Sequence, residues 1–256
     1  MAELWRRTPL WMAYAFLYIP IVVLFGMSFN ASGLPTVWGG FTTSWYGELF
    51  SNDDILGGAR TTLLVAVGST IVATILGTLL AVGLERYNRS RVVDAAVMAP
   101  AIFPDIVMAF SLLAFYTLIG FTLGRVSVMA SHVIFNLAFV ASIVRTRLHN
   151  FDRSVEEAAL DLGASELRTF WRITLPIISP GIVAGALLAF TLSIDEFVIA
   201  FFTNGPAHPT LPVVIYSMVR FGVTPEVNAL AVVLIGLSFT VIFVAQRLGG
   251  VKELFT

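Results

Sequence analysis

The chain has 256 residues, of which 57% are hydrophobic and only 12% are charged, and its net charge is −1. A soluble domain carries roughly 25% charged residues, so this composition, with its mean hydropathy of +0.88, excludes a water-soluble globular protein. Cysteine is absent, which excludes disulfides and thiolate metal sites. The composition therefore indicates an integral membrane protein.

Six long apolar runs follow one another along the chain, and each can cross roughly 30 Å of hydrocarbon as a helix. They are continuously apolar, whereas barrel strands alternate apolar and polar residues. We expect one all-α transmembrane domain over residues 1–256, with a first run too long for a cleaved signal peptide. The predicted spans are residues 9–29, 60–84, 95–120, 124–148, 176–203 and 226–248.

The basic residues fix the expected orientation. If the N-terminus is cytoplasmic, only Arg60, Arg125 and Arg220 of the 15 lysines and arginines lie outside. Cytoplasmic loops are enriched in Lys and Arg, so both termini and the loop 149–175 are predicted to be cytoplasmic. The predicted inside set is Arg6, Arg7, Arg86, Arg89, Arg91, Arg145, Arg147, Arg153, Arg168, Arg172, Arg247 and Lys252.

The second and third spans carry signs of close packing and of a break. Ser69, Ala73, Gly77 and Ala81 recur every four residues, which predicts a smooth helix face that another backbone can approach. In the third span Pro100 and Pro104 must kink the helix, and Asp105 follows directly. Asp105 is expected either to face the interior of the bundle, to cap the restarting half-helix, or to do both.

Histidine gives no indication of a metal site. His132 and Asn136 share one face of the fourth span, where an interhelical hydrogen bond is the expected role of the imidazole. The other two histidines, His149 and His208, fall in loops on opposite sides of the membrane, so no ligand set forms.

The fifth span contains two adjacent acids, Asp195 and Glu196. An acid at a helix centre costs roughly 2.5 to 3.5 kcal/mol on the insertion scale, so the pair is expected to mark a substrate pathway. The alternative is a pair of buried structural carboxylates. Thr191 lies on the face of Asp195. The aromatic candidates for the pathway are Phe190, Phe197 and Phe201, with Tyr216 in the later amphipathic stretch 211–221.

The loop 149–175 has the pattern of two capped helices. Ser154 stands three residues before Glu157, which predicts a capping box at the start of a short helix. Gly163 can take the left-handed conformation that ends such a helix. A second, amphipathic helix is expected from Ser165 along the membrane surface, and Pro176 is expected to begin the next span.

This loop resembles the EAA motif of ABC importer permeases. The matching positions are Glu157, Ala158, Ala159 and Gly163, followed by Ile173, Thr174, Leu175 and Pro176. Residues 104–109, 189–196 and 225–230 are in addition similar to the PotC-type permeases of spermidine/putrescine importers. Where that family is expected to have two aspartates, this chain has Asp195 followed by Glu196.

The resemblance implies a type I ABC importer permease of the MetI-like fold in the bacterial inner membrane. The implied partners are a second permease (PotB-like), two ATPase subunits (PotA-like), a periplasmic polyamine-binding protein (PotD-like) and lipid, without nucleic acid. The chain has no phosphate-binding loop, nucleophile elbow or zinc-binding His pair, so ATP and Mg would be bound by the ATPase subunits. The remaining alternatives are a permease for iron, an anion, a sugar or an opine, a proton-coupled carrier or channel, and a membrane hydrolase.

Overall fold

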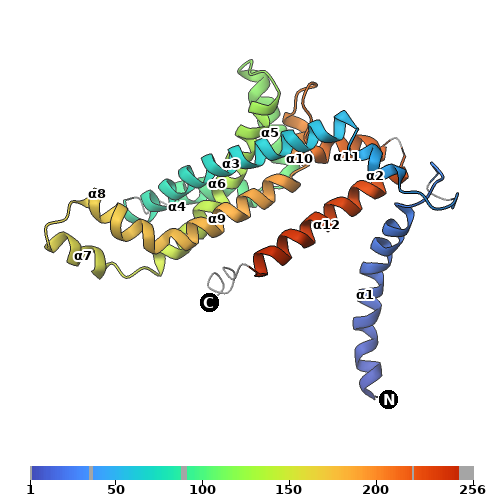
Figure 1. The fold of residues 1–256 in the computed structure, drawn as a ribbon. Helices are drawn as coiled ribbons and strands as arrows, with labels where there is room; N and C mark the ends of the chain where they lie inside the picture. The colour runs from blue at the N-terminus through green and yellow to red at the C-terminus, as the bar shows by residue number, and fades with distance from the viewer. Residues whose placement is uncertain (1, 35–36, 88–90, 221, 248–256) are drawn as a thin grey trace. The chain divides into compact units, whose positions relative to one another are not determined.

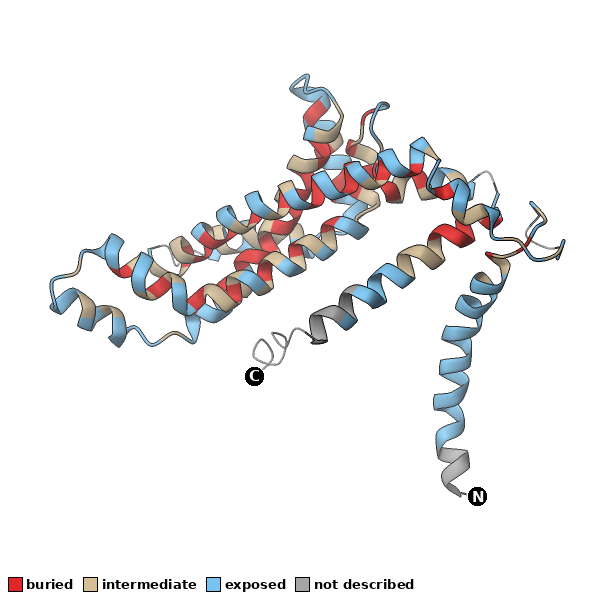
Figure 2. Cartoon of the chain, in the orientation of Figure 1, coloured by how far each residue is buried: buried red, intermediate tan, exposed pale blue. Residues whose placement is uncertain are grey.

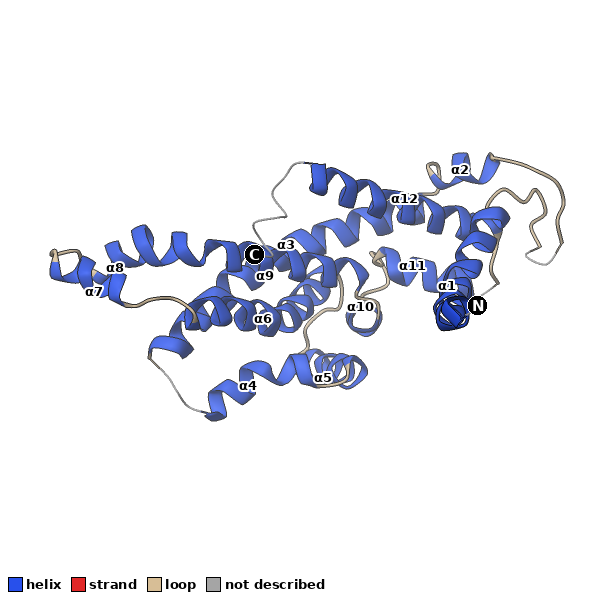
Figure 3. Cartoon of the chain, turned by 90° about the horizontal axis from the view of Figure 1, so that it is seen from below, coloured by secondary structure: helices blue, strands red, loops and turns tan. Residues whose placement is uncertain are grey.

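The computed structural model describes residues 2–34, 37–87, 91–220 and 222–247 (Figure 1). These residues form helices joined by loops (Figure 3). One isolated β-bridge pairs Asn30 with Phe41. The chain divides into two compact units, residues 1–56 with 214–256 and residues 57–213.

The first unit contains α1 (Ala2–Met27), α2 (Ser44–Leu49) and α12 (Pro225–Arg247), and α12 packs against both of the others. Polar contacts fix the loop after α1. The Ser28 and Tyr46 hydroxyls lie 2.7 Å apart, and Trp45 Nε1 donates to the Asn30 carbonyl at 2.8 Å. These contacts hold the described residues between α1 and α2 by their own polar groups.

Helix α1 has almost no protein cover. None of its most apolar 18-residue window is buried, and its described residues are exposed along most of the helix (Figure 2). A backbone that is fully hydrogen-bonded within an apolar helix is stable in hydrocarbon, so this surface suits lipid or another membrane protein.

The second unit holds most of the helices. Its members are α3 (Asp53–Arg86) from Gly57 onward, α4 (Arg91–Ile102), α5 (Asp105–Leu118), α6 (Arg125–His149), α7 (Ser154–Asp161), α8 (Glu166–Thr169), a π-helical turn at Phe170–Thr174, α9 (Leu175–Asp195), α10 (Val198–Thr203) and the start of α11 (Leu211–Arg220). Helices α6 and α9 pack along each other, and α10 packs against α5 and α6.

The predicted small-residue stripe on α3 is a packing surface. Ser69, Ala73 and Ala81 have no exposed surface. A Cβ atom at Gly77 would come within 2.9 Å of the Val140 side chain on α6, so only glycine permits this approach. The buried residues run along the facing sides of α3, α6 and α9 in Figure 2.

The described residues contain four helices long and apolar enough to cross a membrane, or five if one bent pair counts as a span. The bent pair is α4 with α5. The helix axis bends by 107° between them, where Pro100 and Pro104 predict a break. The described apolar part of α12, Pro225–Thr240, is shorter than a full span. Residues 221 and 248, at the ends of two predicted segments, lie outside the described residues.

Candidate functional site

The fifth predicted span is interrupted at its two acids. Helix α9 ends at Asp195, Glu196 is extended with ψ 104°, and α10 starts at Val198. The Glu196 Oε1 atom accepts a hydrogen bond from the Ile199 amide at 3.0 Å. The expectation of one helix through residues 176–203 is therefore wrong, because Glu196 ends one helix and satisfies a first-turn amide of the next.

Asp105 belongs to the same acidic group. It opens α5 directly after the bend, with an exposed side chain, and α5 packs against α10. Asp105 and Asp195 both interact electrostatically with Glu196. Among the described residues no ion pair reaches these three carboxylates, and no group of His, Cys, Asp and Glu is close enough to hold a metal. We call Asp105, Asp195 and Glu196 the acidic break.

The predicted neighbours of the acids lie on two elements of the second unit. Thr191 is exposed on α9 and donates to the Leu187 carbonyl at 2.9 Å, while Phe190 is half-buried on the same helix. The Phe197 and Phe201 rings lie 5.5 Å apart at the start of α10. Phe197 thus directly follows Glu196 in the chain, and Phe201 lies one helical turn further along α10.

Tyr216, the remaining pathway candidate, is exposed on the part of α11 that belongs to the first unit. Its role in the pathway stays a prediction.

A buried polar network supports the end of α9. The Ser193 hydroxyl lies 2.7 Å from His132 Nδ1 and 3.0 Å from the Ser69 hydroxyl, and all three residues are buried. The interhelical hydrogen bond expected of His132 is confirmed. Sequence reasoning missed its partner Ser193, because a serine inside an apolar helix gives no signal of the helix it faces.

The short helix α7 begins where the sequence predicts, but not by the predicted contact. Ser154 lies inside the first turn, and no side chain caps the helix from the preceding position. The carboxylate of Asp152 accepts a hydrogen bond from the Ser154 amide at 3.0 Å. This contact lowers the pKa of Asp152, with a smaller contribution from the Ser154 hydroxyl. The predicted capping box is wrong because Asp152, two residues before Ser154, offers a charged acceptor instead.

The end of α7 is the predicted glycine turn. Gly163 has φ +84°, and nothing lies within 4 Å of where its Cβ would be. The Ala164 amide donates to the Ala159 carbonyl at 3.0 Å and the Gly163 amide to the Leu160 carbonyl at 2.9 Å. These two bonds form a Schellman motif, which satisfies the last free carbonyls of the helix.

The second helix of the loop continues into the membrane segment. The second helix starts at Ser165, as predicted, and Ser165 caps α8 by accepting a hydrogen bond from the Arg168 amide. The chain then passes through the π-helical turn into α9, so Glu166–Asp195 is one helical segment. Helix α9 starts at Leu175 with Pro176 in its first turn, as predicted, but it follows the π-helical turn without the expected boundary. Because proline has no amide and crowds the carbonyl four residues earlier, the wider π turn accommodates Pro176 without a break.

We call residues 154–175 the coupling hairpin; it projects beyond the ends of α4 and α6 (Figure 1). Helix α7 has no buried residue. Glu157 and Ala158 are exposed, whereas Ala159, Ile173 and Leu175 are half-buried and Pro176 is exposed. Most of the motif on α7 therefore remains available to a partner protein.

A neighbouring acid that the motif does not include holds the hairpin to the membrane helices. Glu156 forms an ion pair with Arg86 at the end of α3 and accepts a hydrogen bond from the Thr174 hydroxyl. Arg86 Nη2 also donates to the Thr174 hydroxyl at 3.2 Å. Nearby, Arg145 pairs with Glu85 at 3.3 Å and with Asp94.

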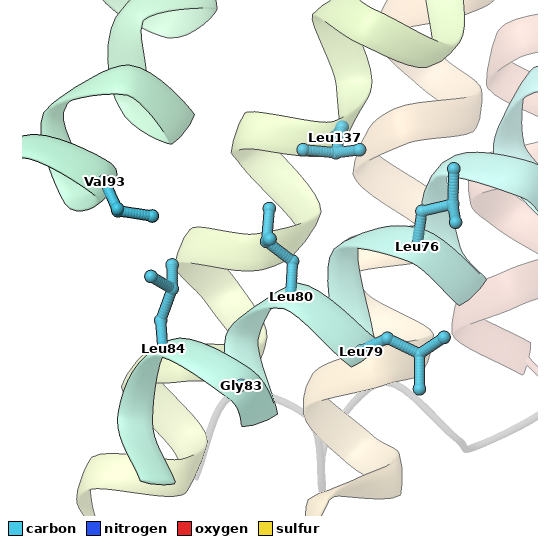
Figure 4. Close-up of a pocket in the computed structure, with 7 residues that line it drawn as sticks. All are labelled: Leu76, Leu79, Leu80, Gly83, Leu84, Val93 and Leu137. Carbon is cyan, nitrogen blue, oxygen red and sulfur yellow. The ribbon is translucent and has the colours of Figure 1, made fainter. Parts of the chain in front are cut away.

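A pocket of about 530 Å³ opens between α3, α4 and α6 (Figure 4). Its lining has no charged or hydrogen-bonding side chain, so it offers nothing to an ammonium or a carboxylate. We therefore place the candidate site at the acidic break. The pocket is lined by Leu76, Leu79, Leu80, Gly83, Leu84, Val93 and Leu137.

Comparison with known proteins gives consistent matches. The model of the family described as "Binding-protein-dependent transport system inner membrane component" matches residues 73–250. The putrescine transport system permease protein PotI of Escherichia coli K12 is 42% identical over 253 residues, covering 95% of this chain and 90% of PotI. The spermidine/putrescine permease protein PotC of the same strain is 46% identical, covering 91% of this chain and 89% of PotC.

A solved structure shows the same fold. The bacterial ABC transporter involved in import of the acidic polysaccharide alginate matches with a TM-score of 0.73 at 18% identity, covering 96% of this chain and 95% of that chain. At this identity the likeness concerns the fold alone.

Proposed function

Because this chain belongs to the binding-protein-dependent transport system inner membrane components, we propose that it is the permease subunit of an ATP-driven polyamine importer. Membership places the chain in the inner membrane as a multi-pass component of a transport system. The substrate class comes from relatives whose names specify putrescine or spermidine. The acidic break supports it independently.

The proposed topology has six crossings in one permease domain of the type I, MetI-like kind. The bent pair α4–α5 is one crossing, and α12 is the last. Twelve of the 15 basic residues then lie on the side of the coupling hairpin, which supports cytoplasmic termini.

The acidic break suits an organic dication. A polyamine carries ammonium groups separated by methylene runs, so carboxylates on two helices can each bind one ammonium. Three carboxylates without a basic partner among the described residues attract such a cation and would repel an anion. Phe197 and Phe201 can contact the methylene stem and the ammonium groups.

The three carboxylates differ in how far other contacts within the protein already use them. Asp195 is exposed at the end of α9 and is our first choice for a substrate contact. Asp105 is second, because its negative charge also stabilises the N-terminus of α5. Glu196 is third, because its carboxylate already accepts the Ile199 amide.

The acidic break lies toward the outer end of the proposed pathway. The 21 residues of α9 rise about 31 Å from Leu175 to Asp195, which is close to the hydrocarbon thickness of a bilayer. With the coupling hairpin in the cytoplasm, the substrate would meet these acids soon after leaving an external binding protein.

The coupling hairpin is the proposed docking surface for an ATPase subunit. Its exposed helix α7 is held at a fixed angle by the Gly163 turn and by Glu156. The complex would contain a second permease, two ATPase subunits that bind ATP and Mg, and a periplasmic polyamine-binding protein.

The observation that carries the proposal is the acidic break, with no basic partner among the described residues, in a chain 46% identical to a spermidine/putrescine permease. The test is ATP-dependent uptake of radiolabelled putrescine and spermidine by the complete transporter in proteoliposomes. Parallel samples would contain sulfate, ferric iron, a sugar or an opine. We expect accumulation of polyamines only. Accumulation of another solute, with no polyamine uptake, would overturn the proposed substrate class.

A further inference from the structure

Glu156, Arg86 and Thr174 form a cluster that joins three elements of the second unit. Glu156 lies on α7, Arg86 ends α3, and Thr174 precedes α9. The side chains of Arg86 and Glu156 are 22% and 14% exposed, and Thr174 is fully buried. Each member contacts the other two. We call this cluster the clasp.

Polar contacts tie the coupling helix to the body of the second unit. Helix α7 has no buried residue, so it has no apolar face anchored in a core. Within the described residues it packs against α8 and the π-helical turn, which belong to the same hairpin. Among the described residues, polar contacts join this region to α3 at the clasp and at Arg153, the residue before α7, which donates to the Glu85 carbonyl at 3.2 Å.

The clasp and the Arg153 contact involve consecutive residues of α3, Arg86 and Glu85, in its last turn. Thr174 brings the start of α9 into the same cluster, and α9 leads without interruption to Asp195. A displacement of α7 is therefore applied directly to α3 and α9, the helices that meet again at the Ser69–Ser193 contact.

We propose that the clasp transmits movement of α7 to α3 and α9 during the ATP cycle. This inference rests on the proposed docking of an ATPase at the coupling hairpin. Arg86, Glu156 and Thr174 act as positioning residues. They stay bonded while the ATPase moves α7, so the helices move with it. Glu157 faces the ATPase, and its neighbour Glu156 faces the membrane helices.

Two variants separate transmission from docking. Glu156→Gln keeps the shape but removes the charge, and the exchange Arg86→Glu with Glu156→Arg restores an ion pair in reverse. Glu48→Gln changes an exposed acid on α2, outside the coupling hairpin and the acidic break, and is the matched control. For each complete transporter in proteoliposomes, putrescine imported per ATP hydrolysed is measured together with the amount of co-purified ATPase.

We expect Glu156→Gln to retain the ATPase and its hydrolysis but to import about fivefold less putrescine per ATP, a loss equivalent to one weakened ion pair. The exchange should recover at least about half of the ratio, and Glu48→Gln should match the unmodified protein. An unchanged ratio in Glu156→Gln would overturn the proposal. So would loss of the ATPase, or an exchange no better than the single variant.

A second readout does not depend on the substrate. Because the chain has no cysteine, spin labels can be attached at cysteines replacing Leu160 on α7 and Ile75 on α3, both exposed. With the clasp intact, the label distance should not change between the ATP-bound and nucleotide-free complexes. With Glu156→Gln it should change by several ångströms. An equal change in both proteins would overturn the clasp, whereas failure of polyamine uptake alone would overturn only the substrate class.

Discussion

The two ends of the second unit treat carboxylates in opposite ways. At the hairpin end, Glu156, Glu85 and Asp94 each pair with an arginine. At the acidic break, Asp105 and Asp195 each interact with Glu196, and none of the three has an ion pair among the described residues. Paired charges hold helices in fixed positions, whereas uncompensated charges attract a ligand of opposite sign. This difference supports our proposal that the first end serves mechanical connection and the second binds a passing cation.

Among single substitutions, the largest effect should come from the turn of the coupling hairpin. Gly163→Val places a β-branched residue at φ +84°, which costs about 1 to 3 kcal/mol and reorients α7. We expect putrescine uptake by the reconstituted complex to fall about tenfold while the permease stays in the membrane. Space is open around Gly163, so Gly163→Asn, which tolerates this backbone, should retain most of the uptake. Equal loss in both variants would show that the backbone conformation is not the cause.

A smaller effect should come from the polar network behind the acidic break. Ser193→Ala leaves His132 Nδ1 and the Ser69 hydroxyl without this partner in the core, at a cost of about 1 to 2 kcal/mol. The apparent unfolding temperature in detergent should fall by a few degrees. Ser111→Ala is the control, because Ser111 is exposed and its hydroxyl bonds the Val107 carbonyl of its own helix. Equal unfolding temperatures for the two variants would contradict a supporting role for Ser193.

The smallest effect concerns the start of α7. The pKa of Asp152 is lowered by its bond to the Ser154 amide, so this contact is fully formed above the ordinary pKa of an aspartate. It is lost only as the pH falls through the lowered pKa. Carboxyl NMR should therefore show a midpoint below that of an ordinary aspartate, and the helix should be insensitive to pH near neutrality. A midpoint at or above the ordinary value would contradict the contact.

Substitution of Asp152 tests the same contact at neutral pH. Asp152→Ala should speed amide hydrogen exchange in the first turn of α7, whereas Asp152→Asn should preserve protection because Asn caps equally well. If Ala and Asn behaved alike, another group would have to cap the helix.

Local chemistry made parts of both ends predictable. Pro100 and Pro104 predict the bend before Asp105, and Gly163 predicts the left-handed turn, because each residue type restricts its own backbone. The composition and apolar runs likewise predict a helical membrane protein.

The remaining features depend on contacts that no local pattern encodes. No glycine or proline marks the break at Glu196, which depends on packing of α10 against α5 and α6. The partner of Glu156 is Arg86, which lies 70 residues away in the sequence. The spacing along the loop therefore could not show that Glu156, and not Glu157, contacts α3. Asp152 was missed because Ser154 fits the common capping pattern equally well.

The contrast between the two ends is tested most directly at the acidic break. Asp105→Asn and Asp195→Asn combined preserve side-chain size and remove both charges. In proteoliposomes with all partner subunits, we expect putrescine uptake to fall about tenfold or more, since each charge-assisted contact contributes about 1.5 to 3 kcal/mol. ATPase co-purification and nucleotide binding should stay unchanged. Uptake of putrescine and spermidine at the unmodified rate would contradict the cationic pathway and leave both carboxylates with structural roles only.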